Sequence, residues 1–378
     1  MRDEWKEISL EDLEIQKVIK LGRGDVISKK DMEADPGLNP VYSSAENKNG
    51  MIGKYAKYMF DEELITWSVD GGGHIFYRPK HKFSVTNIGG WLRILDSKVF
   101  SYQFLTYALQ RLHKQHHFDW QHKAHPSVIR KLYTRIPLPP LPEQKRIVDL
   151  ISSVDSYIES LQLQLESAKR SRNAVLYKLL TAVADDWVER KLPDVVEVLD
   201  RMRKPINSTE REERKGNIPY YGANGQTGWI DEFIFNEELV LLGEDAIDFA
   251  DPSARKAYLI QGPSWVNNHA HVLRADKKII NSYFLMESLN KVDYSQYVSF
   301  GTRSKLTQAS MNGIKVLVPS MKIQEKIVDL LANFDEVIEA TQKSIGDSKV
   351  LRSGMLSNLL SGEHQIPGSY DKVIGAAR

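Results

Sequence analysis

Polar side chains gather in loops of this sequence that are rich in glycine and other turn-forming residues. In the second half of the chain the candidate binding residues are Tyr220, Tyr221, Asn224, Gln226, Asn267, Asn268 and His269. In the first half they are Arg23, Asn47, Lys48, Asn49, His74 and Asn87. Amides and imidazoles place hydrogen-bond donors and acceptors close together, and lysine and arginine add positive charge, so these loops suit recognition of a polar or anionic ligand. Each loop also has a structural interpretation, in which Asn and Gly provide turn geometry and the amides cap backbone groups.

The tract HKQHHFDWQHKAH, residues 113–125, concentrates histidine and lysine. Its candidate residues are His122, Lys123 and His125. At an offset of 180 residues Lys123 aligns with Arg303, which stands close to a further candidate, Lys305. Positive charge at matching places suits contact with a phosphate or a base, and the alternative is a solvated surface charge. The tract is a poor zinc site, because no cysteine or acidic ligand accompanies the histidines at a ligand spacing.

Catalytic constellations are absent from the sequence. The NPVY at 39–42 is close to the NPPY of adenine methyltransferases but lacks the second proline, and no glycine-rich cofactor loop follows a strand and opens a helix. The GGGH at 71–74 lacks the Lys and Ser or Thr of a phosphate-binding loop. With no cysteine and no arguable Ser-His-Asp arrangement, the sequence predicts a protein that binds rather than one that catalyses. A stand-alone methyltransferase with a degenerate motif is the least favoured interpretation.

Two long helices are expected to position these loops, because part of the chain is written twice. The stretch EQKRIVDLISSVDSYIESLQLQLES at 143–167 returns as IQEKIVDLLANFDEVIEATQKSIGD at 323–347, an offset of 180 residues that holds without a gap from Arg135 to Leu180. Proline precedes both copies, where it interrupts no intrahelical hydrogen bond. Each copy therefore predicts a long helix, and Gly362 is predicted to end the second.

Apolar residues recur at alternating spacings of four and three over 147–179 and 327–359, which is typical of a coiled-coil seam. Both copies place an arginine at the same seam position, Arg172 and Arg352. A polar residue there lowers stability but can fix the register of the two helices. Because the chain must travel out and back between the helices, the simplest expectation is an antiparallel pair.

Short apolar runs between Gly, Asn and Asp turns precede each helix and predict mixed α/β modules. The modules are distant copies, since PVYSSAENKNG from Pro40 matches PYYGANGQTG from Pro219. The predicted fold is α+β, with two similar mixed α/β modules joined by a pair of long antiparallel coiled-coil helices in a pseudo-twofold arrangement. The predicted boundaries are 1–140 and 183–320 for the modules, 141–182 and 321–362 for the helices, and 363–378 for a C-terminal tail.

Length and composition agree with two ordinary globular domains. The chain has 378 residues, 42% apolar and 27% charged, and no apolar run approaches the length of about 18 residues that spans a membrane. The charged N-terminus, MRDEWKEISLEDLE, lacks the apolar core of a signal peptide, so a cytoplasmic location is expected. Since the net charge is only +1, any contact with a polyanion depends on local clustering of positive charge.

The order of module, helix, module and helix, with PLPPLPEQKRIVDLI, GRGDVISKKD and PYYGANGQTGWIDEFIF, resembles the DNA-specificity subunit of type I restriction-modification systems over essentially the whole chain. That resemblance implies two target-recognition domains, each of which reads one half of a split site in double-stranded DNA. It also implies that the helices act as a spacer and dock two methyltransferase subunits, with motor-nuclease subunits added in restriction complexes. The chain itself would be non-catalytic and without a cofactor, because S-adenosylmethionine, and the ATP and Mg used in restriction, belong to the partner subunits.

Under this resemblance the polar loops become candidate DNA contacts, since Arg and Lys read guanine and Asn and Gln read adenine. A helix over 144–180 is about 55 Å long, which exceeds the ~34 Å between successive major-groove faces. The first module has TNIGG where the second has NNHAH, so the two should not read the same bases. The alternative is a coiled-coil repeat scaffold without DNA readout, which explains the helices equally well but leaves the polar loops unexplained.

Overall fold

The computed structural model describes residues 5–44, 47–70, 74–118, 121–181, 187–298, 304–362, 364 and 366–371. The chain forms two compact units. Unit 1 comprises Met1–Gln162 and Lys343–Arg378, and unit 2 comprises Leu163–Gln342. Each unit contains one α/β module with one half of each long helix. The boundaries predicted from the sequence separate the helices from the modules, whereas the compact units divide both helices near their middle.

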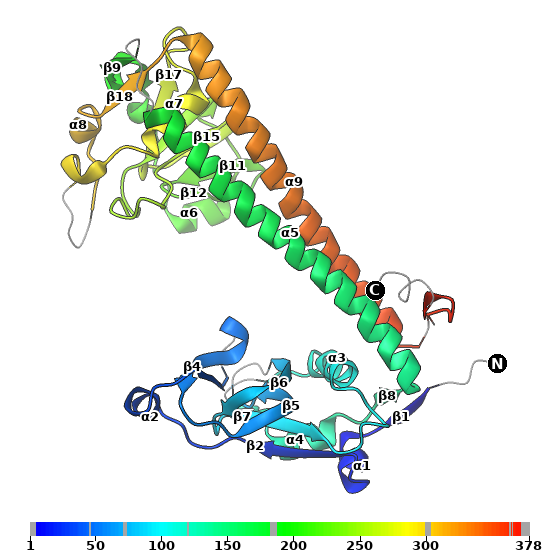
Figure 1. Ribbon diagram of the computed structural model, residues 1–378. Coiled ribbons are helices and arrows are strands. Elements are labelled where there is room, and N and C mark those ends of the chain that lie inside the picture. The colour runs from blue at the N-terminus through cyan, green and yellow to red at the C-terminus, as the bar shows by residue number, and fades with distance from the viewer. Residues whose placement is uncertain are drawn as a thin grey trace. The chain divides into compact units, whose positions relative to one another are not determined.

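The module of unit 1 is built on a six-stranded sheet of order β2-β7-β5-β6-β3-β4. These strands are β2 (Ile19–Arg23), β3 (Asn39–Tyr42), β4 (Met51–Tyr55), β5 (Phe60–Ser68), β6 (Ile75–Val85) and β7 (Gly89–Ile94). A separate ribbon pairs β1 (Lys6–Ile8) with β8 (Ile136–Leu138). The helices are α1 (Leu10–Ile15), α2 (Lys29–Ala34), α3 (Tyr102–His113) and α4 (Pro126–Leu132), with a 3-10 turn at Asn47–Gly50. One core joins the sheet, α3 and the end of the helix pair (Figure 1).

Unit 2 repeats this plan with its sheet broken in two, of orders β10-β17-β14-β15 and β12-β11-β16-β13. The strands are β9 (Val188–Lys191), β10 (Val196–Val198), β11 (Ile218–Gly222), β12 (Gly225–Ile230), β13 (Phe235–Asn236), β14 (Leu239–Gly243), β15 (Ala257–Ile260), β16 (Pro263–Val266), β17 (Ala270–Ala275) and β18 (Lys315–Val318), which pairs with β9. The helices are α6 (Ser208–Glu213), α7 (Ser282–Leu289) and α8 (Gln308–Met311), with 3-10 turns at Leu192–Asp194, Asp200–Met202 and Tyr294–Gln296. The break between β15 and β16 falls at Gly262, whose φ of 80° is incompatible with a strand.

The long helices are α5 (Leu141–Thr181) and α9 (Met321–Leu360), which lie side by side (Figure 1). In unit 1 Asp155 of α5 binds Arg352 of α9, and in unit 2 Arg172 of α5 binds Asp335 of α9. Moving forward along α5 from Asp155 to Arg172 corresponds to an equal step backward along α9 from Arg352 to Asp335, so the helices are antiparallel and both pairs have the same register. Seam residues such as Ile147, Ile151, Leu165, Ile327 and Leu331 are buried, and α9 stops just before Gly362, whose φ is 73°. The predicted fold class is confirmed.

A buried glutamine ties each module to its helix. In unit 1 the Gln144 side chain accepts a hydrogen bond from the backbone N–H of Ser101, the N-cap of α3, and donates to the carbonyls of Val99 and Pro139. In unit 2 Gln324 makes the same three bonds, with the N–H of Asn281, the N-cap of α7, and with the carbonyls of Ile279 and Pro319. Both glutamines are fully buried, so each amide fixes the angle between a module helix and a long helix.

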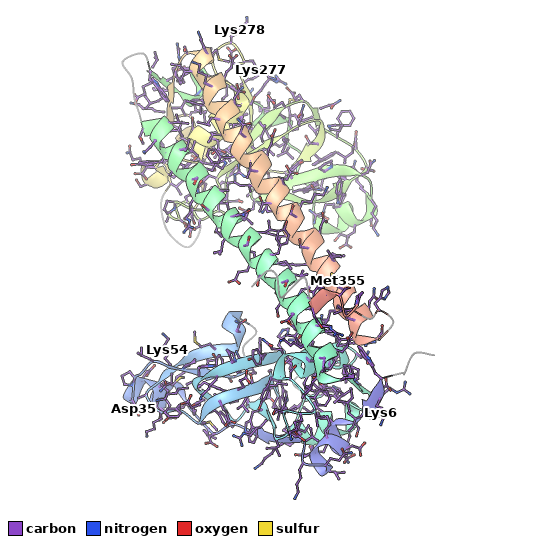
Figure 2. The ribbon with its side chains drawn as sticks, turned by 45° about the vertical axis from the view of Figure 1, so that its right-hand side comes forward. Lys6, Asp35, Lys54, Lys277, Lys278 and Met355 are labelled. Carbon is purple, nitrogen blue, oxygen red and sulfur yellow. The ribbon has the colours of Figure 1, made fainter. Side chains whose placement is uncertain are left out.

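Residues 366–371, which follow α9, form part of unit 1. Ile366 is buried in the core of the unit, and Met355 of α9, which is labelled in Figure 2, is partly buried against the same core. Arg146 in the first turns of α5 binds the Asp371 carboxylate through two hydrogen bonds of 2.9 and 2.7 Å. The tail therefore adds to the junction between the module and the helix pair. Within the described residues, no helix is both long enough and apolar enough to cross a bilayer.

Candidate nucleic-acid interface

Hydrogen bonds draw the polar loops of unit 1 together. The Arg23 side chain donates to the Asn87 carbonyl over 2.9 Å. The hydroxyl of Thr86 donates to the Ser43 hydroxyl, and the backbone N–H of Thr86 donates to the Tyr42 carbonyl. The backbone N–H of Val69 donates to Ile88, and that of Ala124 donates to Val69. We call the resulting surface polar face 1, and its predicted residues are Arg23, Asn49, His74, Asn87, His122, Lys123 and His125. Of these, Asn87 and His125 are half-buried and the others are exposed.

The polar loops of unit 2 meet through the same backbone bonds. The N–H of Asn267 donates to the Tyr221 carbonyl, which is the counterpart of the bond from Thr86 to Tyr42 in unit 1. The N–H of Glu244 donates to the His269 carbonyl, which is the counterpart of the bond from Val69 to Ile88. Leu306 N–H donates to Glu244, the counterpart of the bond from Ala124 to Val69. The Asn224 side chain adds a bond of 2.8 Å to the Ala246 carbonyl. We call this surface polar face 2, and its predicted residues are Tyr221, Asn224, Gln226, Asn267, Asn268, His269 and Lys305.

The structure corrects one of the predicted contacts. Tyr220 is only 1% exposed and packs in a core with Ile230 and Trp265, so the prediction that it binds DNA is wrong. Because successive side chains of a strand point to opposite faces, Tyr221 points out of this core and Tyr220 into it. Arg303 and the side chains of Asn47 and Lys48 lie outside the described residues.

The structural partner of Lys123 is Lys305 rather than Arg303. Lys123 directly precedes Ala124, and Lys305 directly precedes Leu306, whose N–H groups bond to the carbonyls that follow the equivalent strands β5 and β14. Each lysine also lies two residues before an N-cap, which is His125 of α4 in unit 1 and Thr307 of α8 in unit 2. The first copy has two more residues between this N-cap and the start of the ungapped repeat at Arg135 and Lys315, so an offset of 180 residues misaligns the loop. Each lysine also meets an acid on the strand end, with Lys123 Nζ 3.1 Å from Asp70 and Lys305 Nζ 2.9 Å from Glu244.

Some predicted contacts also have a structural role. His125 is the N-cap of α4, and its Nδ1 accepts from the N–H of Ser127. Burial lowers the pKa of His125, as do the charges of Arg23 and Arg130, so the ring remains a neutral acceptor. The Asn267 side chain accepts from the N–H of His269 and shapes that turn. His125 therefore caps a helix and Asn267 shapes a turn, which are the structural roles that the sequence offered as the alternative to binding.

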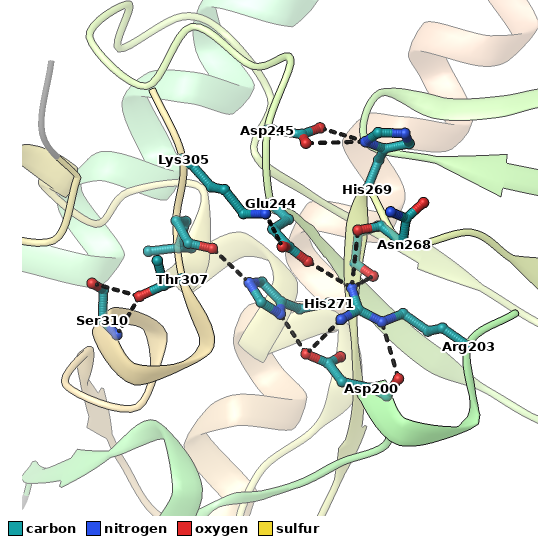
Figure 3. Close-up of polar contacts among 12 residues, drawn as sticks. Asp200, Arg203, Glu244, Asp245, Asn268, His269, His271, Lys305, Thr307 and Ser310 are labelled. Carbon is teal, nitrogen blue, oxygen red and sulfur yellow. Dashed lines mark hydrogen bonds and ion pairs between the residues drawn. The ribbon is translucent and has the colours of Figure 1, made fainter. Parts of the chain in front are cut away.

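A buried ionic network lies beneath polar face 2 (Figure 3). The Asp200 carboxylate binds the His271 ring at 2.6 Å and accepts from the Val272 N–H at 2.9 Å. Arg203 donates to Glu244 and to the Ala270 carbonyl, at 2.8 Å each. Sequence reasoning missed Asp200, Arg203 and His271, because the bonds from Arg203 to Glu244 and from Asp200 to His271 and Val272 span 41 to 72 residues along the chain.

Burial by itself would raise the pKa values of Asp200 and Glu244, but the hydrogen bonds and charges around them reverse that effect. For Asp200 the donors are His271 and the Val272 N–H, and for Glu244 they are Lys305 and Arg203. Both carboxyl groups therefore have lowered pKa values in the folded chain. The network holds its acids ionised, which keeps the cations of polar face 2 in fixed places.

These lowered pKa values predict that unit 2 loses stability in acid. The stabilisation is fully present above the ordinary pKa values of 3.8 for Asp and 4.5 for Glu, and is lost as the pH falls through the lower folded values. Urea unfolding at a series of pH values measures this acid limb. Asp200→Asn and Glu244→Gln should each flatten it, whereas an unchanged limb in both variants would show that the network contributes nothing to acid stability.

The fold and the two polar faces define a class, namely a duplicated recognition protein in which paired helices join two similar modules with different loops. The family model described as the type I restriction modification DNA specificity domain matches residues 2–169 and again residues 184–346. The chain therefore belongs to the type I restriction-modification DNA-specificity family, whose members are specificity subunits rather than catalytic ones.

Individual relatives agree with this assignment. The chain is 27% identical over 326 residues to a Mycoplasma pneumoniae protein named as a type I specificity subunit, covering 84% of this chain and 87% of the relative. It is 32% identical over 165 residues to a Haemophilus influenzae protein named as a type I restriction enzyme specificity subunit, which is 43% of this chain and 40% of that relative. The crystal structure of a type I S subunit from M. genitalium has the same fold, with a TM-score of 0.61 at 19% identity over 95% of this chain and 97% of that one.

Proposed function

We propose that this chain is the DNA-recognition and assembly subunit of a type I restriction-modification complex, in which each module reads one half of an asymmetric bipartite site. The observation that carries the proposal is the duplication of the polar face. The same backbone hydrogen bonds bring the same loops together twice, while the side chains that these loops present differ. A shared scaffold with unlike side chains is what two readers of unlike sequences require.

The polar faces offer the side chains that DNA recognition uses. In polar face 2, Asn268 and His269 are exposed on one turn, and the exposed Lys305 binds Glu244, whose N–H donates to the His269 carbonyl. In polar face 1, Arg23 and Lys123 bring positive charge to the same loops as Asn87. Amides and guanidinium groups can read base edges, and lysines can neutralise phosphates. The proposed DNA-binding surface is the set of predicted residues without Tyr220.

We also propose that α5 and α9 set the spacing of the half-sites and dock two methyltransferase subunits. Each long helix contributes to both compact units, so the helices run from one module to the other. Outside the seam, Tyr157 of α5 and Val337 of α9 are each 55% exposed, and they are equivalent residues of the repeat. Exposed apolar residues at matching places on two helices suit two copies of one partner.

Co-expression with a methyltransferase subunit in a methylation-free host, followed by sequencing of the modified adenines, tests the proposal. A split and asymmetric motif would support two unlike readers and identify both half-sites. A stable complex that modifies no DNA would overturn the recognition proposal and favour a scaffold. Replacing residues 267–269 should then change the bases of one half-site and leave the other half unchanged.

Lys123→Ala and Lys305→Ala are each expected to weaken DNA binding to a similar degree on every sequence. Loss of one phosphate contact should reduce the slope of log affinity against log salt by about one. Titration of the complex with DNA at several salt concentrations measures both effects. Lys278→Ala is the matched control, since Lys278 follows the end of β17 that is remote from polar face 2 (Figure 2). A slope that changes as much in the control as in the two variants would contradict the contact.

A further inference from the structure

One backbone carbonyl is held in the same way in both modules, directly after the equivalent lysines. In unit 1 the indole N–H of Trp67 donates to the Ala124 carbonyl over 2.8 Å, and this bond is buried. In unit 2 the Nε2 of His271 bonds to the Leu306 carbonyl, also buried and also at 2.8 Å. Each bond fixes the segment that carries a lysine of the polar face, Lys123 or Lys305.

The two ring donors occupy opposite strands of equivalent cross-strand pairs in the two units. Trp67 of β5 faces Gly90 of β7, and at the equivalent place Leu242 of β14 faces His271 of β17. A Cβ atom on Gly90 would lie 2.2 Å from the Trp67 indole, so glycine is required where the tryptophan occupies the space. The ring has changed strands between the modules, yet its N–H still reaches the same carbonyl.

This exchange separates the role of the bond from simple packing. The two pairs fill their space differently, with tryptophan against glycine in unit 1 and leucine against histidine in unit 2, so volume by itself does not require a ring nitrogen at the carbonyl. In each pair, however, one residue has a ring that carries an N–H donor, and that ring reaches the carbonyl. The retained feature is therefore the hydrogen bond to the lysine segment.

In unit 2 the histidine also joins that segment to the neighbouring loop. A carbonyl only accepts, so Nε2 of His271 carries a proton, and Nδ1 meets the Asp200 carboxylate at 2.6 Å. Asp200 in turn forms an ion pair with Arg203 at 3.3 Å, and Arg203 donates to the Ala270 carbonyl next to His269. The Lys305 segment and the turn at Asn267–His269 are thus held by one buried network.

We propose that Trp67 and His271 are positioning residues, each of which sets the DNA contacts of its own module by holding the lysine segment in place. This inference rests on the proposed function. Neither side chain reaches the surface, since Trp67 is 3% exposed and His271 is fully buried, so any effect on DNA passes through the loops that they hold.

The test uses the full chain with its methyltransferase subunit and DNA duplexes altered in one half-site at a time. Trp67→Phe keeps an aromatic ring but removes the N–H, and His271→Leu removes both ring nitrogens. We expect each variant to lose discrimination by about tenfold in its own half-site, which is the scale of one buried hydrogen bond, with the other half-site read as before. His271→Gln keeps an amide donor for the Leu306 carbonyl and should recover most of the discrimination.

Equal losses in both half-sites, or unchanged discrimination in Trp67→Phe and His271→Leu, would overturn the inference. If His271→Leu does not fold, the comparison of Trp67→Phe with the natural chain decides the question, because that change is conservative. A natural chain that modifies no split motif would instead overturn the proposed function, so the two failures can be told apart.

Discussion

Arg172→Leu is expected to lower the free energy of unfolding of unit 2 by about 3–5 kcal/mol, the scale for removing one partner of a buried ion pair. The guanidinium binds Glu287 at 2.7 Å and Asp335 at 2.5 Å, and it also donates to the Tyr283 hydroxyl. The Glu287 side chain is only 4% exposed, so leucine would leave a buried carboxylate without its closest cation. The sequence predicts the opposite sign, with leucine stabilising the seam, because it does not reveal these acids.

Arg352→Leu is the matched control at the equivalent seam position. Arg352 binds one carboxylate, that of Asp155, whose side chain is 42% exposed, and its guanidinium lies 5.7 Å from the centre of the Tyr107 ring. Since Asp155 can be solvated after the change, we expect a loss of at most about 1 kcal/mol. Urea unfolding gives the total losses, and hydrogen exchange over 163–181 assigns the larger loss to unit 2. Equal losses in the two variants would rule out the buried pair as the cause, and Arg172→Leu with Glu287→Leu should recover part of the loss.

Gln144→Ala and Gln324→Ala are each expected to detach a module helix from its long helix. Either change leaves one backbone N–H and two carbonyls without their side-chain partner. A buried polar group left without a partner costs roughly 1–3 kcal/mol, so a loss of at least about 2 kcal/mol is expected in the unit concerned. Urea unfolding and hydrogen exchange at Ser101 and Asn281 measure the loss and its place.

Gln164→Ala provides the control for this pair, because Gln164 is exposed on α5. It removes the same atoms without uncovering buried groups, and alanine is a good helix former, so its effect should be within about 0.5 kcal/mol. A loss in Gln144→Ala as small as in this control would mean that water replaces the amide at the junction. The equivalence of the two sites also predicts similar losses in Gln144→Ala and Gln324→Ala.

The helices could be predicted from the sequence because the information that specifies them is local. The spacing of apolar residues gives the seam, the 180-residue repeat gives two copies, and proline and Gly362 mark the ends, all within a few turns of each residue concerned. The family could be inferred for the same reason, since the order of the parts and their motifs are linear features of the chain.

The polar faces were decided by the tertiary structure. Tyr220 and Tyr221 are alike in sequence, and only the strand register buries the first and turns the second, which is half-buried, to the opposite face. The equivalence of Lys123 and Lys305 emerges from backbone bonds to strand ends, because two additional residues in one loop defeat a linear offset. The ligands of Arg172 lie 115 and 163 residues away from it. Contacts of such separation depend on how strands pair and helices pack, which local periodicity does not encode.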